Sequence, residues 1–183
     1  MKKTETGIKN LYVIEPTVHG DDRGYFMESF SEEWFKKEIA DTHFVQDNES
    51  KSSRGVLRGL HFQNPPMAQA KLVRVVQGEV LDVAVDLRKN SPTYGKHFTV
   101  LLSAENKKQL FVPRGFAHGF SVLSETAVFS YKVDNSYSRE LEEGIRWDDP
   151  KLNIDWHLPA DEVRLSEKDE SQQDFANYVS QFS

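Results

Sequence analysis

The 183-residue chain contains no cysteine, which excludes disulfide bridges, thiolate nucleophiles and thiolate zinc sites. This absence fits a reducing compartment, and we expect a cytoplasmic protein. The sequence also lacks any stretch that approaches the roughly 20 apolar residues of a membrane span. Its N-terminus shows no apolar segment of signal-peptide length. We therefore expect no membrane partner.

Positive charge is also in short supply, with 23 Lys and Arg against 29 Asp and Glu and a net charge of -6. General nucleic-acid binders usually carry a basic surface, so we expect no nucleic-acid partner. The balance still permits a small anionic ligand, because a few Arg and Lys side chains in one pocket can bind a diphosphate.

Apolar residues are plentiful, at 38% hydrophobic with 12 Phe and 3 Trp, and the length predicts one folded domain over residues 1–183. Most of the middle has the pattern of strands. Residues 71–76 end at Gln77-Gly78, and residues 79–87 then alternate polar and apolar side chains. This pattern predicts a hairpin with one buried face.

Further strand-like runs follow at regular spacing and indicate a sandwich or barrel. They span residues 97–102, 109–112, 116–123 and 126–133. Two earlier extended segments, residues 11–14 and 25–30, are expected to add strands to these sheets. Because pairing with a second chain can cover exposed sheet edges, we expect a homodimer.

Helical patterns occur only near the two ends. Ser31 is a suitable N-cap for a helix over residues 32–39. Near the C-terminus, Phe175, Tyr178, Val179 and Phe182 recur at helical spacing and predict a helix over residues 170–182.

Two histidine-containing segments concentrate polar residues inside the strand-rich region. In the first, simple strand alternation places Arg58 and His61 on opposite faces, unless Gly59 or a bulge breaks it. The second, residues 113–120, has a Pro-x-Gly-x-x-His form that resembles the second sequence motif of cupins. We attribute Gly115 and Gly119 to tight bends that need a positive φ.

Metal binding is not expected. Metal-dependent cupins pair the second motif with a His-x-His segment, whereas this chain has His61-Phe62-Gln63 at the corresponding place. A three-histidine site would therefore lack a ligand. We expect neither a metal nor another cofactor.

Taken together, the motifs resemble those of the dTDP-4-dehydrorhamnose 3,5-epimerase family. The resemblance covers nearly the whole chain, in the right order. It runs through Asp22-Arg23-Gly24-Tyr25-Phe26-Met27-Glu28, Gln46-Asp47-Asn48, Arg58 to Gln63, Lys71, Pro113 to Phe120, Tyr131-Lys132-Val133-Asp134 and Ser166-Glu167-Lys168-Asp169.

This resemblance implies an all-β, cupin-type jelly-roll barrel with a few short peripheral helices and a site in the barrel mouth. The implied activity is isomerisation of dTDP-4-dehydro-6-deoxy-D-glucose to dTDP-4-dehydro-L-rhamnose, in deoxysugar and polysaccharide biosynthesis. The ketone acidifies the hydrogens on carbons 3 and 5, so a base and a proton donor on opposite faces suffice.

The resemblance also implies the catalytic roles. His61 corresponds to the base, a suitable choice because imidazole titrates near neutral pH. Asp169 corresponds to the carboxylate that orients this base, and Tyr131 to the proton donor. Lys71 corresponds to the group that stabilises negative charge on the ketone oxygen.

For substrate binding, the resemblance implies a larger set. Tyr137 is expected to stack on the thymine. In a dimer with exchanged N-terminal strands, Arg23 and Glu28 are expected to act in the partner's site. The substrate-binding set comprises Arg23, Phe26, Glu28, Gln46, Asp47, Asn48, Arg58, Lys71, His118, Tyr137, Glu142 and Lys168.

Other interpretations remain open at this point. Without the resemblance, Tyr131 would be an ordinary strand aromatic, Lys71 and Arg58 surface charges, and Asp169 part of an exposed helix start. A close alternative is a mono-epimerase or 3,4-ketoisomerase on a related dTDP-4-keto-6-deoxyhexose. A metal-dependent cupin oxygenase and a non-catalytic nucleotide-sugar-binding cupin belong to different classes.

Overall fold

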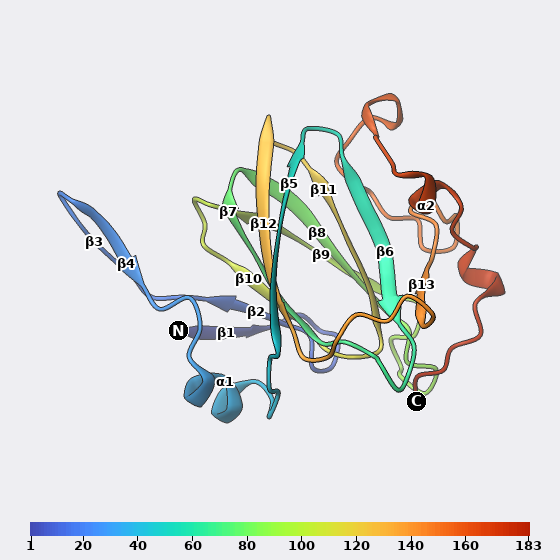
Figure 1. Ribbon diagram of the computed structural model, residues 1–183, viewed down its shortest axis with the longest axis horizontal. Helices are drawn as coiled ribbons and strands as arrows, with labels where there is room; N and C mark the ends of the chain where they lie inside the picture. The colour runs from blue at the N-terminus through green and yellow to red at the C-terminus, as the bar shows by residue number, and fades with distance from the viewer.

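A computed structural model describes all residues, 1–183, and confirms the jelly-roll fold. Two antiparallel sheets face each other, and an N-terminal hairpin projects away from them (Figure 1). The six-stranded sheet has the order β1 (Lys2–Glu5), β2 (Tyr12–Glu15), β10 (Gln109–Val112), β7 (Lys71–Gln77), β12 (Thr126–Val133) and β5 (Gln46–Ser53). The five-stranded sheet has the order β13 (Glu142–Gly144), β6 (Leu57–Gln63), β11 (Phe116–Val122), β8 (Glu79–Asp86) and β9 (His97–Ser103).

The main hydrophobic core lies between these sheets. Val73 and Val75 of β7 pack in one cluster with Val80 and Ala84 of β8, which belong to the opposite sheet. Asp82 lies between Val80 and Ala84 and therefore shares their inward face, since side chains alternate along a strand. The barrel interior thus holds polar groups among its apolar ones.

The predicted hairpin of residues 71–87 is wrong. β7 and β8 belong to different sheets, so Gln77-Gly78 is a corner between sheets rather than a two-strand turn. Gly78 has a φ of +77°, and a Cβ there would lie 2.0 Å from the carbonyl oxygen of Thr126. Sequence pattern could not separate these alternatives, because a corner and a hairpin both need a flexible residue between two apolar runs.

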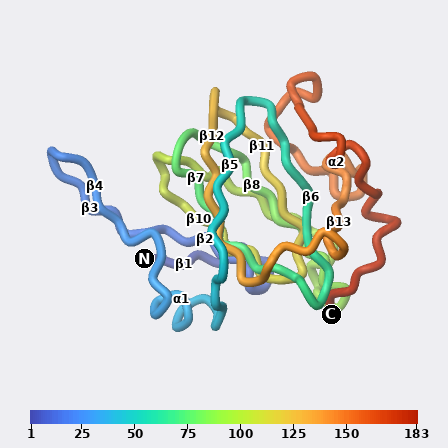
Figure 2. Tube along the Cα trace, in the orientation of Figure 1, coloured from blue at the N-terminus to red at the C-terminus, as the bar shows by residue number.

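The expectation of one buried face for residues 79–87 is also wrong, because β8 is buried on both faces. Leu81, Val83 and Val85 point away from the barrel interior and pack against Trp156, Tyr178 and other residues of the C-terminal segment. This segment runs along the outside of the β6 and β13 edge, as Figure 2 shows. It is the cover that keeps the second face from solvent.

The N-terminal helix prediction is confirmed, since α1 (Glu32–Glu38) begins after Ser31, whose side chain accepts from the backbone of Trp34. The predicted helix over residues 170–182 is wrong. That region holds only the end of α2 (Glu167–Glu170) and a short 3-10 turn, Phe175–Asn177. A second 3-10 turn spans Ala160–Glu162. None of these helices has the length and apolar character needed to cross a membrane.

The C-terminal aromatic residues explain the error. Tyr178 and Phe182 pack edge-on against Phe62 of β6, with ring centroids 4.9 Å and 6.2 Å away, whereas Val179 is exposed. An irregular chain lying on the barrel wall places these rings better than a helix would. Packing against the barrel therefore outweighs the helical spacing.

Two early extended segments were predicted to add strands to the main sheets, and only one of them does. Residues 11–14 largely form β2, which joins the six-stranded sheet as predicted. Residues 25–30 do not join the main sheets, because β4 (Gly24–Met27) pairs only with β3 (Val18–Asp21). This β3–β4 hairpin extends away from the barrel (Figures 1 and 2). Its Tyr25 and Phe26 side chains are exposed.

Candidate active site

A cavity of about 300 Å³ brings all four predicted catalytic residues together. Its walls come from both sheets and from α2, so residues far apart in the sequence meet in one space. The lining residues are Ser50, Arg58, His61, Lys71, His118, Phe120, Phe129, Tyr131, Glu142, Ser166, Lys168 and Asp169. Among them Ser50, Phe120, Phe129 and Ser166 were not predicted as site residues, because the residue type alone does not mark a Ser or Phe as cavity-facing.

Gly59 explains how Arg58 and His61 share this cavity. Its φ is +135°, and the pairing of β6 with β11 shifts register beside it, so the strand alternation is broken there. A Cβ on Gly59 would lie 2.6 Å from the Cα of Gly119, and one on Gly119 would lie 2.7 Å from the carbonyl oxygen of Arg58. The two glycines let the strands approach closely, which resolves the alternative that the sequence left open.

The expected positive φ holds for Gly115, at +91°, but not for Gly119. Gly119 lies within β11, where the need is for space and not for an unusual backbone angle. A tight bend and a close strand contact both favour glycine, so the sequence alone could not distinguish them.

His61 and Asp169 form a hydrogen-bonded pair at one side of the cavity. His61 Nε2 lies 2.5 Å from Asp169 Oδ1, and the Ser166 hydroxyl donates to Oδ2 of the same carboxylate at 2.6 Å. Burial alone would raise the pKa of Asp169, but the hydrogen bonds from His61 and Ser166 hold that pKa below its usual range. The carboxylate therefore stays ionised and orients the imidazole, leaving Nδ1 to accept a proton.

Tyr131 and Lys71 enter the cavity from neighbouring strands of the six-stranded sheet. Burial raises the pKa of the Tyr131 phenol, which keeps it protonated at neutral pH. Burial lowers the pKa of Lys71 to about 8, against the opposing influence of Asp82 and Glu142. A neutral phenol suits a proton donor, and an ammonium in a poorly solvated cavity suits a site of developing negative charge.

A second histidine–carboxylate pair lies deeper. His118 Nε2 is 3.0 Å from both carboxylate oxygens of Asp82, and Asp82 is fully buried. Burial raises the pKa of Asp82, while the contact with His118 opposes that rise. Sequence reasoning missed Asp82, although an aspartate between Leu81 and Val83 in an apolar strand was a visible signal.

The mouth of the cavity carries an ionic network. Lys168 of α2 forms an ion pair with Glu142 of β13, and the Tyr137 hydroxyl donates to Glu142 at 2.6 Å. Burial alone would raise the pKa of Glu142, but the hydrogen bonds from Lys168 and Tyr137 hold it below its usual range. Arg58 donates to the Ser52 hydroxyl at 3.1 and 3.2 Å, which points its guanidinium along the wall.

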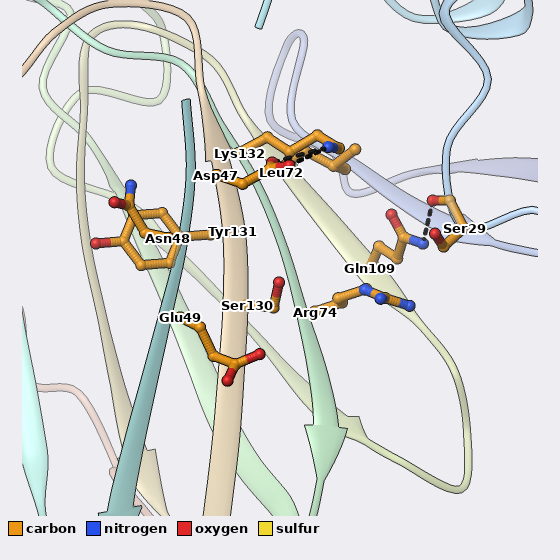
Figure 3. Close-up of a pocket in the computed structure, with 10 residues that line it drawn as sticks. All are labelled: Ser29, Asp47, Asn48, Glu49, Leu72, Arg74, Gln109, Ser130, Tyr131 and Lys132. Atoms are coloured by element: carbon orange, nitrogen blue, oxygen red, sulfur yellow. Dashed lines mark hydrogen bonds and ion pairs between the residues drawn. The ribbon is translucent and has the colours of Figure 1, made fainter. Parts of the chain in front are cut away.

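The remaining predicted binding residues do not line this cavity. Arg23, Phe26 and Glu28 are exposed on or just after the β3–β4 hairpin. Figure 3 shows a groove that includes the outer face of β12 and β5, where Asp47 pairs with Lys132 at 2.8 Å. Asn48 lies on the Tyr131 side of the sheet in the same view. Its Oδ1 atom accepts a hydrogen bond from the Gln46 side chain at 2.7 Å.

Gln63 occupies the position at which a metal-dependent cupin would carry its second histidine. Its side chain donates to the backbone oxygens of Met67 and Ser136 and accepts from the backbone of Ser138, so it ties loops together. No group of three or more His, Asp or Glu side chains has an arrangement that could hold a metal ion.

The chain is similar in sequence to known epimerases. A family model described as dTDP-4-dehydrorhamnose 3,5-epimerase matches residues 5–177. The dTDP-4-dehydrorhamnose 3,5-epimerase of Shigella flexneri is 54% identical over 178 residues, covering 97% of each chain.

Solved structures agree with this match. The crystal structure of the Elizabethkingia anophelis enzyme of the same name has a TM-score of 0.92 at 56% identity, covering 96% of this chain and 97% of that one. The Legionella pneumophila 3,5-epimerase in complex with dTDP-4-keto-L-rhamnose has a TM-score of 0.93 at 47% identity, covering 97% and 94%. The chain belongs to the dTDP-4-dehydrorhamnose 3,5-epimerase family.

Proposed function

We propose that this isomerase converts dTDP-4-dehydro-6-deoxy-D-glucose into dTDP-4-dehydro-L-rhamnose by inverting carbons 3 and 5. The observation that carries the proposal is the convergence of the His61–Asp169 pair, the Tyr131 phenol and the Lys71 ammonium on one cavity. Family membership supports the same activity. The reaction moves protons only, so it needs no redox carrier.

In the proposed mechanism, His61 removes the proton from a carbon next to the ketone. The electron pair of the broken carbon–hydrogen bond forms an enolate, whose negative oxygen is stabilised by the Lys71 ammonium. Tyr131 then gives its proton to the opposite face of that carbon, which inverts the centre. Loss of the His61 proton to solvent and reprotonation of Tyr131 restore both groups for the second carbon.

The nucleotide end is assigned to the cavity mouth. Arg58 and Lys168 supply positive charge for the diphosphate, and Tyr137 offers an exposed ring on which thymine can stack. Gln46 and Asn48 extend the proposed binding set along β5, whereas Asp47 lies on the outer face of the sheet in an ion pair with Lys132. Asn48 pairs directly with Tyr131 across the strands, which puts it close to the reacting groups.

A homodimer would account for the residues that are outside the cavity. The β3–β4 hairpin projects away from the barrel (Figure 1). It contains Arg23 and Phe26, Glu28 follows just after it, and its apolar side chains Tyr25 and Phe26 are exposed. We propose that this hairpin reaches the cavity of a second copy. We also propose that residues 1–183 form one catalytic domain and that the reaction takes place in the cytoplasm, in line with the lack of cysteine.

Proton NMR of the substrate in deuterium oxide tests the proposed function. The intact protein is expected to exchange hydrogen for deuterium at carbons 3 and 5, and His61→Asn is expected to lose about 10²–10⁴-fold in rate. His157→Asn is the matched control, because His157 is exposed outside the cavity and its φ of +56° suits asparagine. Exchange at one carbon only would indicate a mono-epimerase, and none would exclude the epimerase.

A further inference from the structure

Asp82 is a buried ionisable group that the proposed mechanism leaves without a role. It is fully buried on the inward face of β8, between Val80 and Ala84. A carboxylate in such a place costs several kcal/mol unless charges or hydrogen bonds compensate it. Its surroundings therefore have to supply those partners.

His118 is the first partner. It lies on the neighbouring strand β11 and contacts both oxygens of Asp82 through Nε2. No side-chain nitrogen or oxygen that is sealed from solvent lacks a hydrogen-bond partner. Since Nδ1 of His118 forms no hydrogen bond within the protein, it must reach the cavity that His118 lines.

Lys71 is the second partner, through charge and not through a hydrogen bond. Its Nζ also has no hydrogen-bond partner in the protein and, by the same reasoning, opens to the cavity. Asp82 exerts the largest opposing influence on the lowered pKa of Lys71. One carboxylate thus acts on two groups that face the substrate space.

We infer that Asp82 is a positioning residue that holds His118 as a hydrogen-bond acceptor towards the sugar and keeps Lys71 as an ammonium ion. This role rests on the proposed epimerase function. When the neutral imidazole of His118 donates from Nε2 to Asp82, its Nδ1 carries the lone pair and can accept from a sugar hydroxyl. Lys71 donates to the ketone oxygen beside it, so acceptor and donor together fit a hydroxyl next to a ketone.

The other acidic groups of the cavity have partners of their own, and only Glu142 among them also favours the ammonium form of Lys71. Glu142 of β13 is already engaged by Lys168 and Tyr137, and Lys168 itself opposes protonation of Lys71. Asp169 is engaged by His61 and Ser166. The remaining ionisable side chains that line the cavity are Arg58, Tyr131 and His118.

The decisive experiment compares Asp82→Asn with Asp86→Asn in the full chain. Both aspartates are fully buried in β8 and lie on the same face, but Asp86 bonds to Arg88, Ser91 and Thr93 outside the cavity. As the pH rises, the kcat/KM of the wild type should fall with a midpoint near the Lys71 pKa of about 8, where the ammonium loses its proton. Asp82→Asn should move this midpoint down by about 1–3 pH units, and Asp86→Asn should leave it unchanged.

A structural role alone would lower the melting temperature of both variants and leave both midpoints in place, which would overturn the inference. Titration of the Lys71 side chain by carbon-13 NMR gives the same comparison without turnover. The inference can therefore fail while the epimerase activity stands, and it can be tested even if the activity is absent.

A measurement on the wild type tests the inference even if Asp82→Asn does not fold. Nitrogen-15 NMR of His118 at neutral pH should find Nε2 protonated and Nδ1 bare. A proton on Nδ1, whether or not Nε2 also carries one, would contradict the inference, because Nδ1 could then not accept from the sugar.

Discussion

The two histidine–aspartate pairs of the cavity use the same residue types in different surroundings. His61 is a quarter exposed, and its partner Asp169 also accepts from Ser166 and the Gly59 backbone. His118 is almost fully buried, and Asp82 has no other hydrogen-bond donor. The pKa of Asp169 is lowered and that of Asp82 is raised, because only Asp169 has enough donors to offset its burial.

This contrast supports a different proposed role for each histidine–aspartate pair. A pair with a partly exposed imidazole and an ionised carboxylate suits a base that must gain and lose protons. A buried pair suits the fixed orientation of a binding group. The exposure of the imidazole and the number of donors to the carboxylate, and not the residue types, separate the two roles.

Lys71→Met should have the largest effect of the substitutions near the two pairs, because it removes the ammonium beside the buried pair. Loss of one donor to a developing oxyanion is expected to lower kcat by about 10²–10³-fold. Steady-state kinetics measures this loss, with Lys151→Met as a control at an exposed position outside the cavity. An unchanged kcat with a raised KM would assign Lys71 to binding alone.

The same substitution should stabilise the fold at neutral pH. The pKa of Lys71 falls from 10.5 to about 8 on folding, so its charged form costs up to about 3 kcal/mol below pH 8. This penalty decreases as the pH rises from 8 to 10.5. Urea unfolding at pH 7 and pH 10 should show a gain for Lys71→Met at pH 7 that shrinks at pH 10.

Asp169→Asn tests the more solvated pair. It removes an ionised acceptor of several hydrogen bonds and should lower the free energy of unfolding at neutral pH by about 1.5–3 kcal/mol. Because the pKa of Asp169 is lowered on folding, this stabilisation is present above its unfolded value of about 3.9 and is lost as the pH falls below it. Urea unfolding at pH 7 and pH 3 should show a difference between wild type and variant that shrinks at pH 3.

Tyr137→Phe should have the smallest effect, because the residue is exposed at the mouth beside the first pair. The variant loses only the hydrogen bond from the Tyr137 hydroxyl to Glu142, so its free energy of unfolding should differ from that of the wild type by less than about 0.5 kcal/mol. The ring that is proposed to stack on thymine is kept. Calorimetric titration with dTDP should give near wild-type affinity for Tyr137→Phe and weaker binding for Tyr137→Ala, and equal affinities of the two variants would exclude stacking.

Much of the fold followed from local patterns. The strand positions within the barrel and the Ser31 cap of α1 were predictable, because alternation and capping depend on neighbouring residues. The corner at Gly78 and the C-terminal segment were not. Both depend on which distant surface a segment meets, and a single-chain pattern contains no such information.

The sequence by itself determined the family and the residue types proposed for proton transfer, since the motifs of the family occur in order along almost the whole chain. Only the tertiary structure decided which residues share the cavity. Asp169 meets His61 across 108 positions, and Gly59 and Gly119 break the alternation that would have separated His61 from Arg58. Local periodicity sets the direction of a side chain, but the pairing of distant strands sets its neighbours.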